Sequence, residues 1–294
     1  MRSAMMAAGI EPPAELIADG TVRRFDVPGD KTQSKNGWYV LFSDPPAGAF
    51  GCWKRGIRET WRGQSLDEKS RAEIRDAIAK SRVSRLAAET AAKMACRERA
   101  AEIWKASIPC GDNPYLAKKG VHGYGVRAHC GAVVVPVRDT AGTLHGLQFI
   151  SADGTKKFLT GTAKRGCYHA IGKIKGRLYI CEGYATGASI HEATGHAVAV
   201  AFDAGNLKPT AEQLRRKYPA MKLVICADND QWTEGNPGLT KAKEAASAAG
   251  ASVIFPAFKD LESKPTDFND MAALSGLDVL RMALESWNDE ETHA

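Results

Sequence analysis

Two stretches of sequence decide the fold of this chain: Leu178-Tyr179-Ile180-Cys181-Glu182-Gly183 and Leu223-Val224-Ile225-Cys226-Ala227-Asp228-Asn229-Asp230. Each begins with a short apolar run typical of a buried strand, and each ends in carboxylates. Similar apolar runs follow at 197–202 and 252–255, with helical stretches between the runs. Strands that alternate with helices predict an α/β fold over residues 177–294, in which a parallel sheet carries flanking helices.

Three acidic residues stand where this sheet is expected to carry its functional groups. Glu182, Asp228 and Asp230 follow directly on two apolar strands, and the carboxyl ends of neighbouring parallel strands meet at one edge. The spacing of Asp228 and Asp230 points both carboxylates the same way in an extended segment. Such crowding of like charge is costly unless a divalent cation neutralises it, and oxygen ligands suit Mg²⁺ or Mn²⁺. Either acidic motif alone would more often be a capped turn, but the two together favour a metal site.

Other residues near these strands have two open interpretations. Asp267 and Asp270 either add ligands to the same edge or cap a helix. Gly183 opens a helix whose free N–H groups can hold a phosphate. Lys241 either contacts a nucleotide phosphate or is a solvated surface lysine.

Charge is distributed unevenly along the chain. Residues 113–177 hold 11 Lys and Arg against 2 Asp and Glu, whereas residues 178–294 hold 10 against 17. This asymmetry fits a surface that grips phosphates beside a pocket that collects cations, although two solvated surfaces would explain it equally well.

The remaining chain predicts three further parts. Residues 38–42 form a compact aromatic and aliphatic run between turn signals, as in a small β-rich unit. Ser65-Leu66-Asp67-Glu68 has the form of a capping box, and the absence of Gly and Pro from there to Ser107 predicts one long exposed helix or two in series. Apolar runs separated by turns over residues 132–159 predict an antiparallel meander. The predicted domains are a β-rich unit (1–62), a helical spacer (63–107), a basic α+β subdomain (108–176) and the α/β domain (177–294).

The cysteines and the N-terminus exclude several classes of protein. Seven cysteines occur without a C-x-x-C pair, so we expect neither a disulfide framework nor zinc, and a scattered site from Cys110, His122, His129 and Cys130 is disfavoured. No apolar stretch approaches the ~20 residues that span a bilayer, and residues 1–20 lack the apolar run of a secretory signal. A cytoplasmic protein without a membrane partner is therefore expected.

The two acidic motifs resemble the Toprim domain shared by bacterial-type primases, topoisomerases, OLD-type nucleases and a recombination mediator. The resemblance covers about residues 177–276, and 182–195 look most like the primases of phages and conjugative plasmids. It extends back to 113–121 and 147–169, which are similar to the basic subdomain preceding Toprim in those proteins.

This resemblance implies a metal-dependent DNA primase, a nucleotidyltransferase that makes short primers on single-stranded DNA in phage or plasmid replication. Glu182 would lie at the metal as general base or ligand, while Asp228 and Asp230 bind Mg²⁺ that holds nucleoside triphosphates. A replicative helicase is an implied partner. The residues expected to track template phosphates are Lys118, Lys119, Arg127, Lys156, Lys157, Lys164 and Arg165. Tyr115, Phe149 and Phe158 are candidate stacking platforms for bases, although each aromatic residue taken alone would more often belong to the core.

Two other functions use the same fold. A Toprim nuclease would use these acids to hydrolyse DNA phosphodiesters, and a non-catalytic Toprim scaffold would only bind nucleic acid. Retention of all three acids argues against the scaffold. The chain also lacks the zinc-binding module of cellular primases, which puts independent start-site selection in question.

Overall fold

The computed structural model describes residues 1–31, 33–44, 46–63 and 68–286. They form two compact units, Met1–Thr90 and Ala91–Ala294, which are described separately below. The predicted capping box at Ser65 lies outside the described residues. No helix in these ranges is long and apolar enough to cross a membrane. The four-part division predicted from the sequence remains a prediction.

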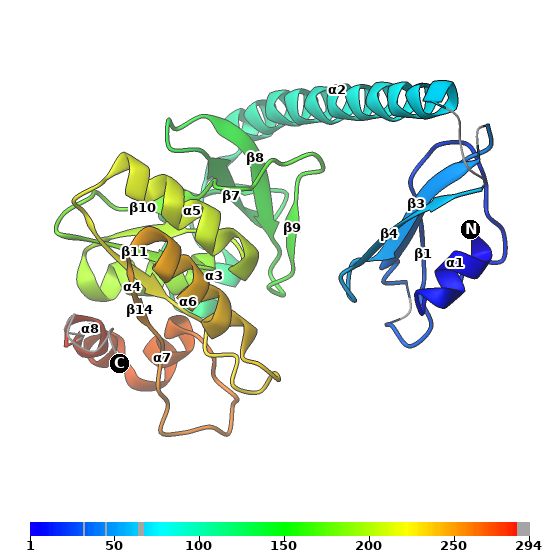
Figure 1. Cartoon of the computed structure of the whole chain (residues 1–294). Coiled ribbons are helices and arrows are strands. Elements are labelled where there is room, and N and C mark those ends of the chain that lie inside the picture. Colours follow the sequence, from blue (N-terminus) through cyan, green and yellow to red (C-terminus); the bar gives the residue numbers. More distant parts are fainter. Residues whose placement is uncertain (32, 45, 64–67, 287–294) are drawn as a thin grey trace. The chain divides into compact units, whose positions relative to one another are not determined.

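The N-terminal unit is built on a four-stranded antiparallel sheet in the order β1-β2-β3-β4 (Figure 1). Its elements are α1 (Arg2–Ala7), β1 (Arg23–Phe25), β2 (Gly37–Phe42), β3 (Ala47–Cys52) and β4 (Ile57–Arg62). One face of the sheet carries a small core of Phe25, Tyr39 and Phe50, onto which Met5 and Ile10 pack from the segment around α1. A sheet this small buries one face only, so its other face is left without a covering core.

Helix α2 (Glu68–Ala106) is a single helix of 39 residues that runs from the first unit into the second. The sequence predicted an exposed helix, and Val83, Leu86 and Met94 are indeed 49–66% exposed. Its last turns are anchored in the second unit, because Cys96 and Ala100 are fully buried and Ala100 packs with Val134 and Leu147 of the next sheet.

The predicted antiparallel meander is confirmed as a five-stranded sheet. Its strands lie in chain order: β5 (Ile108–Pro109), β6 (Arg127–His129), β7 (Ala132–Arg138), β8 (Leu144–Ile150) and β9 (Lys156–Phe158). Helix α3 (Pro114–Lys119) begins at Asn113, whose side chain accepts a hydrogen bond from the Tyr115 N–H, and ends at Gly120 in the left-handed conformation. Val133, Val135 and Ile150 share one core with the following α/β sheet, so the two sheets form a continuous body.

The predicted α/β fold is confirmed for the C-terminal part. The sheet has the order β10-β12-β11-β13-β14, with β11 in the middle and parallel to both neighbours. Its strands are β10 (His169–Ile171), β11 (Arg177–Cys181), β12 (Ala197–Val200), β13 (Lys222–Cys226) and β14 (Ser252–Ile254). Its helices are α4 (Tyr184–Thr194), α5 (Ala204–Lys217), α6 (Pro237–Ala249), α7 (Phe268–Ser275) and α8 (Leu277–Glu285).

Helices cover both faces of this sheet, as parallel strands require (Figure 1). Side chains alternate along β11, so Tyr179 packs into the core with α4, α7 and α8, while Leu178 and Ile180 pack against α5 and α6. With both faces closed, the edge at the carboxyl ends of the strands is the place where polar loops converge.

Candidate active site

Strands β11 and β13 bring the two acidic motifs to the same edge of the sheet. They pair in parallel with Cys181 opposite Cys226, so Glu182 and Asp228 leave the sheet one and two residues beyond that pair. Four buried residues precede Glu182 and five precede Asp228, which fixes the chain up to the point where the carboxylates begin. The structure therefore places these two motifs at one edge, as the sequence predicted.

Glu182 and Asp228 are half-buried, and each has one carboxylate oxygen that is fully buried. Burial, reinforced by the charge of Asp230, raises the pKa of Glu182 to about 7. Burial, and next the charge of Glu182, raises the pKa of Asp228 to about 8. Within the described residues, Glu182 Oε1 and Asp228 Oδ1 have no hydrogen-bond partner. Buried polar atoms are almost always satisfied in folded proteins, and two unsatisfied oxygens on neighbouring acids fit a site that binds a cation.

The donor set fits a divalent cation, although the ligands are not assembled around one point. Among the residues that the structure describes, no three His, Cys, Asp or Glu side chains stand close enough together to hold a metal ion. Carboxylate oxygens with unused lone pairs are nevertheless the ligands that Mg²⁺ and Mn²⁺ take. A shared ion between Glu182, Asp228 and Asp230 thus remains a prediction.

Asp230 also has a structural contact. Its Oδ2 accepts a hydrogen bond from the Gly238 N–H in the first turn of α6, at 3.1 Å. Gly238 permits this approach, because a Cβ there would lie 2.7 Å from the Asp228 carbonyl oxygen and 2.9 Å from Asp230 Oδ2. The loop after β13 is therefore folded back onto the start of α6, and Gly238 is a site residue that the sequence interpretation missed.

Asp267 and Asp270 form a reciprocal capping box at the start of α7. Asp267 accepts hydrogen bonds from the Asn269 and Asp270 N–H groups at 2.8 and 2.9 Å, and Asp270 Oδ2 accepts from the Thr266 N–H at 2.9 Å. Asp267 is close enough for its charge to raise the pKa of Asp228. Of the two interpretations left open by the sequence, the helix cap is the one that the hydrogen bonds support.

Asp203 and Ala204 belong to the site but were given no role from the sequence. They follow β12, which pairs in parallel with β11 so that Val200 lies opposite Cys181. The charge of Asp203 raises the pKa of Glu182, while a hydrogen bond from the Ala204 N–H to the Glu182 carboxylate lowers it. The rule that located the other acids, that they follow strands of one parallel sheet, would have found this pair too.

Three of the predicted lysines lie near the acids. The charge of Lys156, on β9, lowers the pKa of both Glu182 and Asp228. Lys164 forms an ion pair with Asp203, and its ammonium also lies 5.3 Å from the centre of the Phe158 ring. Lys119 Nζ lies 4.0 Å from Asp270 Oδ1.

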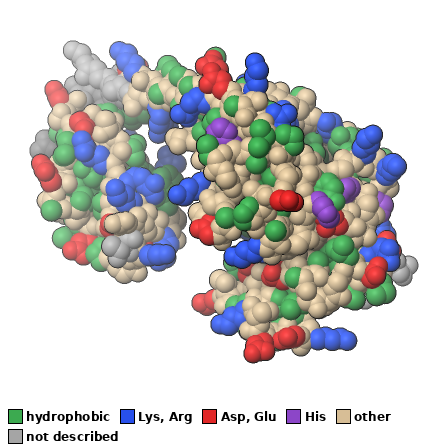
Figure 2. All heavy atoms as spheres, turned by 180° about the vertical axis from the view of Figure 1, so that it is seen from behind, with side chains coloured by type: hydrophobic (Ala, Val, Ile, Leu, Met, Phe, Trp, Pro, Cys, Tyr) green, Lys and Arg blue, Asp and Glu red, His purple; other side chains and the backbone are tan. Residues whose placement is uncertain are grey.

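The other basic residues predicted from the sequence are exposed or have structural contacts away from the acids. Lys118, Lys157 and Arg165 are exposed. Arg127 stacks over the Trp104 ring at 4.6 Å and donates to the Trp104 carbonyl oxygen, so it joins α2 to β6. Lys241 is paired with Glu244 on its own helix. Figure 2 shows Lys and Arg side chains spread over the visible face of the larger unit, interspersed with acidic and apolar ones.

Of the aromatic residues expected to stack on bases, Tyr115 does not fit. It is 2% exposed in the core below α3, so its ring cannot reach a base. Phe158 is partly buried and packs edge-on against Phe202, with ring centres 5.7 Å apart. Tyr115 is an isolated aromatic residue in a basic segment, and its sequence context does not show whether its ring is buried or exposed.

Comparison with known proteins identifies the domain that carries this site. Residues 177–278 match the model of the Toprim domain. Over 263 residues the chain is 36% identical to a DNA primase TraC of Escherichia coli, covering 82% of this chain and 24% of that protein. A second DNA primase TraC of Escherichia coli is 34% identical over 285 residues, covering 90% of this chain and 19% of that protein. The chain thus spans a quarter or less of the length of these relatives, and the Toprim resemblance predicted from its acidic motifs is confirmed.

Solved structures of primases are similar as well. The DnaG primase catalytic domain bound to single-stranded DNA matches with a TM-score of 0.46 and 14% identity, covering 67% of this chain and 80% of that one. The zinc-binding and RNA polymerase domains of the Aquifex aeolicus primase match with a TM-score of 0.45 and 16% identity, covering 97% and 83%.

Proposed function

We propose that this chain, a Toprim-domain protein homologous to part of the plasmid primases called TraC, is the catalytic part of a DNA primase. It would join nucleoside triphosphates into short primers on single-stranded DNA. The observation that carries the proposal is the pair of buried, unpartnered carboxylate oxygens, Glu182 Oε1 and Asp228 Oδ1, at the carboxyl edge of the sheet. A replicative helicase is proposed as a partner.

Asp228, Glu182 and Asp230 are the residues that would hold Mg²⁺ or Mn²⁺. When bound, the ion would neutralise nucleotide phosphate charge and polarise the phosphorus that the primer 3′-hydroxyl attacks. Glu182 Oε1 is free to contact the ion or to accept the proton of that hydroxyl. The Gly238 N–H donates a hydrogen bond to Asp230 Oδ2 and so orients this carboxylate.

The positive groups around the acids would bind the nucleotide. Lys156 is close enough to act on both Glu182 and Asp228, and we assign it to the triphosphate. Helix α4 begins at Gly183 without a side-chain cap, so its first N–H groups can donate to a phosphate. The proposed contacts to the template are the exposed residues Lys118, Lys157 and Arg165, with Lys119 beside them.

The test is primer synthesis by the full chain on single-stranded DNA with labelled nucleoside triphosphates and Mg²⁺ or Mn²⁺. Wild type is compared with Asp228→Asn, and with Asp278→Asn as the control, because Asp278 is an acid on α8 with a side chain 85% exposed. Short products that vanish only in Asp228→Asn support the proposal. Degradation of the template, lost in the same variant, would replace the primase with the nuclease. DNA binding without either reaction would leave a scaffold and refute the proposed enzyme.

A further inference from the structure

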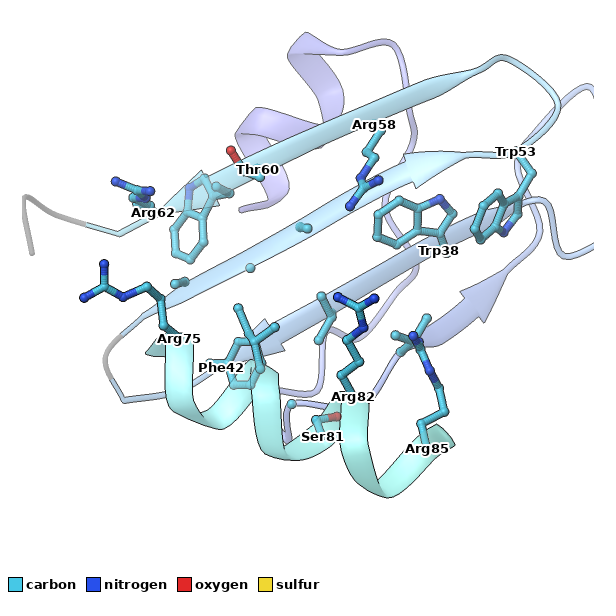
Figure 3. A pocket seen from close by; sticks show the side chains of 18 residues that line it. Trp38, Phe42, Trp53, Arg58, Thr60, Arg62, Arg75, Ser81, Arg82 and Arg85 are labelled. Carbon is cyan, nitrogen blue, oxygen red and sulfur yellow. The ribbon is translucent and has the colours of Figure 1, made fainter. Parts of the chain in front are cut away.

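The uncovered face of the N-terminal sheet is a groove with a floor of small residues. On the central strand, Ala47, Ala49 and Gly51 point to this face, opposite the face that carries Phe50. Cross-strand register places Trp38, Val40 and Phe42 of β2 along one side, and Arg58, Thr60 and Arg62 of β4 along the other. An aromatic and aliphatic wall therefore faces a basic and polar one across a strand that has no bulky side chains (Figure 3).

One largely exposed tryptophan, Trp53, stands at one end of this groove and packs against the buried Trp38. Trp53 is 64% exposed, and its ring lies 5.6 Å from that of Trp38 at an angle of 33°. Gly51 leaves room for the Trp38 indole, because a Cβ there would lie 2.9 Å from two of the indole atoms. The open face of the Trp53 indole offers apolar contact area and a π-surface on which a planar group can stack, and it lies beside the groove.

The charged side chains described along the groove are all basic. Its cavity, of about 880 Å³, is lined by five arginines, and in the part of the chain that the structure describes no Asp or Glu lines it. None of these arginines forms an ion pair with a described carboxylate. They come from β4 and from the helix facing it: Arg58, Arg62, Arg75, Arg82 and Arg85.

We propose that this groove is a second nucleic-acid site and binds single-stranded DNA. The exposed Trp53 indole can stack on an unpaired base, which every single-stranded sequence offers, while the arginines of the groove hold the phosphates on either side of it. Duplex DNA is a poor fit, because its bases are already stacked on each other and present only their edges. An acidic peptide would satisfy the arginines but would leave the exposed Trp53 ring without a partner. This inference rests on the proposed function in one respect: the single-stranded DNA that the groove binds would be the template of the primase.

Binding of labelled oligothymidine by the full chain tests whether the Trp53 ring stacks on a base. Trp53→Ala is expected to weaken binding about tenfold, since loss of one base-stacking contact has an effect of this size. Trp53→Phe, which keeps a stacking ring, should restore most of the affinity. Met6→Ala is the matched control, because Met6 is an apolar residue of the same unit and is 63% exposed.

The salt dependence of oligothymidine binding tests whether the arginines of the groove contact phosphates. Arg58→Ala/Arg62→Ala should lower the slope of log affinity against log salt concentration by about 1.4, because each lost phosphate contact contributes about 0.7 on a single strand. Lys31→Ala/Lys35→Ala, which removes two exposed charges of the same unit outside the groove, should leave the slope unchanged.

Three results would overturn the inference: unchanged binding in the groove variants, equal losses for Trp53→Ala and Trp53→Phe, or duplex DNA bound as tightly as the single strand. The test is separate from that of the proposed function. A chain that binds oligothymidine through the groove but makes no primers contradicts only the primase. A chain that makes primers while the groove variants bind like wild type contradicts only the groove.

Discussion

Asp228 is a half-buried acid whose buried Oδ1 has no described hydrogen-bond partner, so without a cation the folded chain must either bury its charge or take up a proton there, and both oppose folding at neutral pH. A cation that binds the folded chain alone stabilises it by about 2.7 kcal/mol at one hundred times its dissociation constant. For a unit of this size that corresponds to a rise in melting temperature of about 5 to 10 °C.

We therefore predict that Mg²⁺ or Mn²⁺ raises the melting temperature of wild type relative to the same chain in EDTA. In Asp228→Asn the rise should vanish, and the variant should melt higher than wild type in EDTA because asparagine neither buries a charge nor takes up a proton on folding. Scanning calorimetry measures both effects, and Asp278→Asn should behave as wild type. An unchanged metal response in Asp228→Asn would remove Asp228 from the metal site.

His169 on β10 should make the fold sensitive to acid. It is 3% exposed, its Nε2 donates to the Tyr124 carbonyl oxygen at 2.8 Å, and burial lowers its pKa to about 4. The unfolded chain takes up a proton near pH 6.5 and the folded chain only near pH 4, so stability is complete above about pH 6.5 and falls as the pH drops toward 4.

Urea unfolding at pH 7.5 and pH 4.5 should show this loss as a difference between wild type and His169→Gln. Glutamine can donate the same hydrogen bond but does not titrate, so the variant should lose less stability on acidification, by on the order of 2 to 3 kcal/mol. Acid also protonates carboxylates, but these are common to both proteins and cancel in the comparison. Equal losses in the two proteins would show that His169 is not the titrating group.

At the scale of the element, the sequence predicts strands well where they are central and buried. The apolar runs before Glu182 and Asp228 gave β11 and β13 to within one residue at each end, because a strand buried on both faces must be apolar throughout. Strand β10 was not predicted, since its three residues are too few for a pattern and pairing with β12 alone makes them a strand.

Helix α5 shows why the rest could not be predicted. A helix was expected around residues 212–218, yet it begins at Ala204, before Gly205 and Pro209, which locally indicate a loop. Its first turn is held by tertiary contacts of Asn206, whose side chain accepts from the Gly166 N–H and donates to the Cys167 and Ala201 carbonyl oxygens. Bonds to residues distant in sequence leave no local signal.

Asn206→Ala should accordingly loosen the start of α5. The variant removes three hydrogen bonds to buried backbone groups, of which only the Cys167 carbonyl oxygen keeps a second donor, the Thr210 hydroxyl, and we expect a loss of about 2 to 4 kcal/mol in unfolding free energy. Hydrogen exchange should show faster exchange over 204–210, next to the Ala204 N–H that binds Glu182. Lys208→Ala, on the exposed side of the same turn, should change neither quantity. Unaltered exchange in Asn206→Ala would mean that helical propensity alone holds this turn.

For the whole molecule, the arrangement of cores implies two units that unfold independently. The N-terminal core around Phe50 shares no residue with the cores of 91–294, and α2 between them exposes Val83 and Leu86. A unit of about 90 residues buries a smaller fraction of its surface than one of about 200, so the N-terminal unit should melt first.

Calorimetry of the full chain should therefore resolve two transitions that respond to different ligands. Mg²⁺ should shift only the upper one, because the acids lie in Ala91–Ala294, whereas oligothymidine in EDTA should shift the lower one through the groove on β2, β3 and β4. In Trp53→Ala the shift caused by oligothymidine should shrink while the shift caused by Mg²⁺ remains. In Asp228→Asn the shift caused by Mg²⁺ should vanish while the shift caused by oligothymidine remains. A single transition that moves with either ligand would show that α2 couples the two units into one cooperative fold.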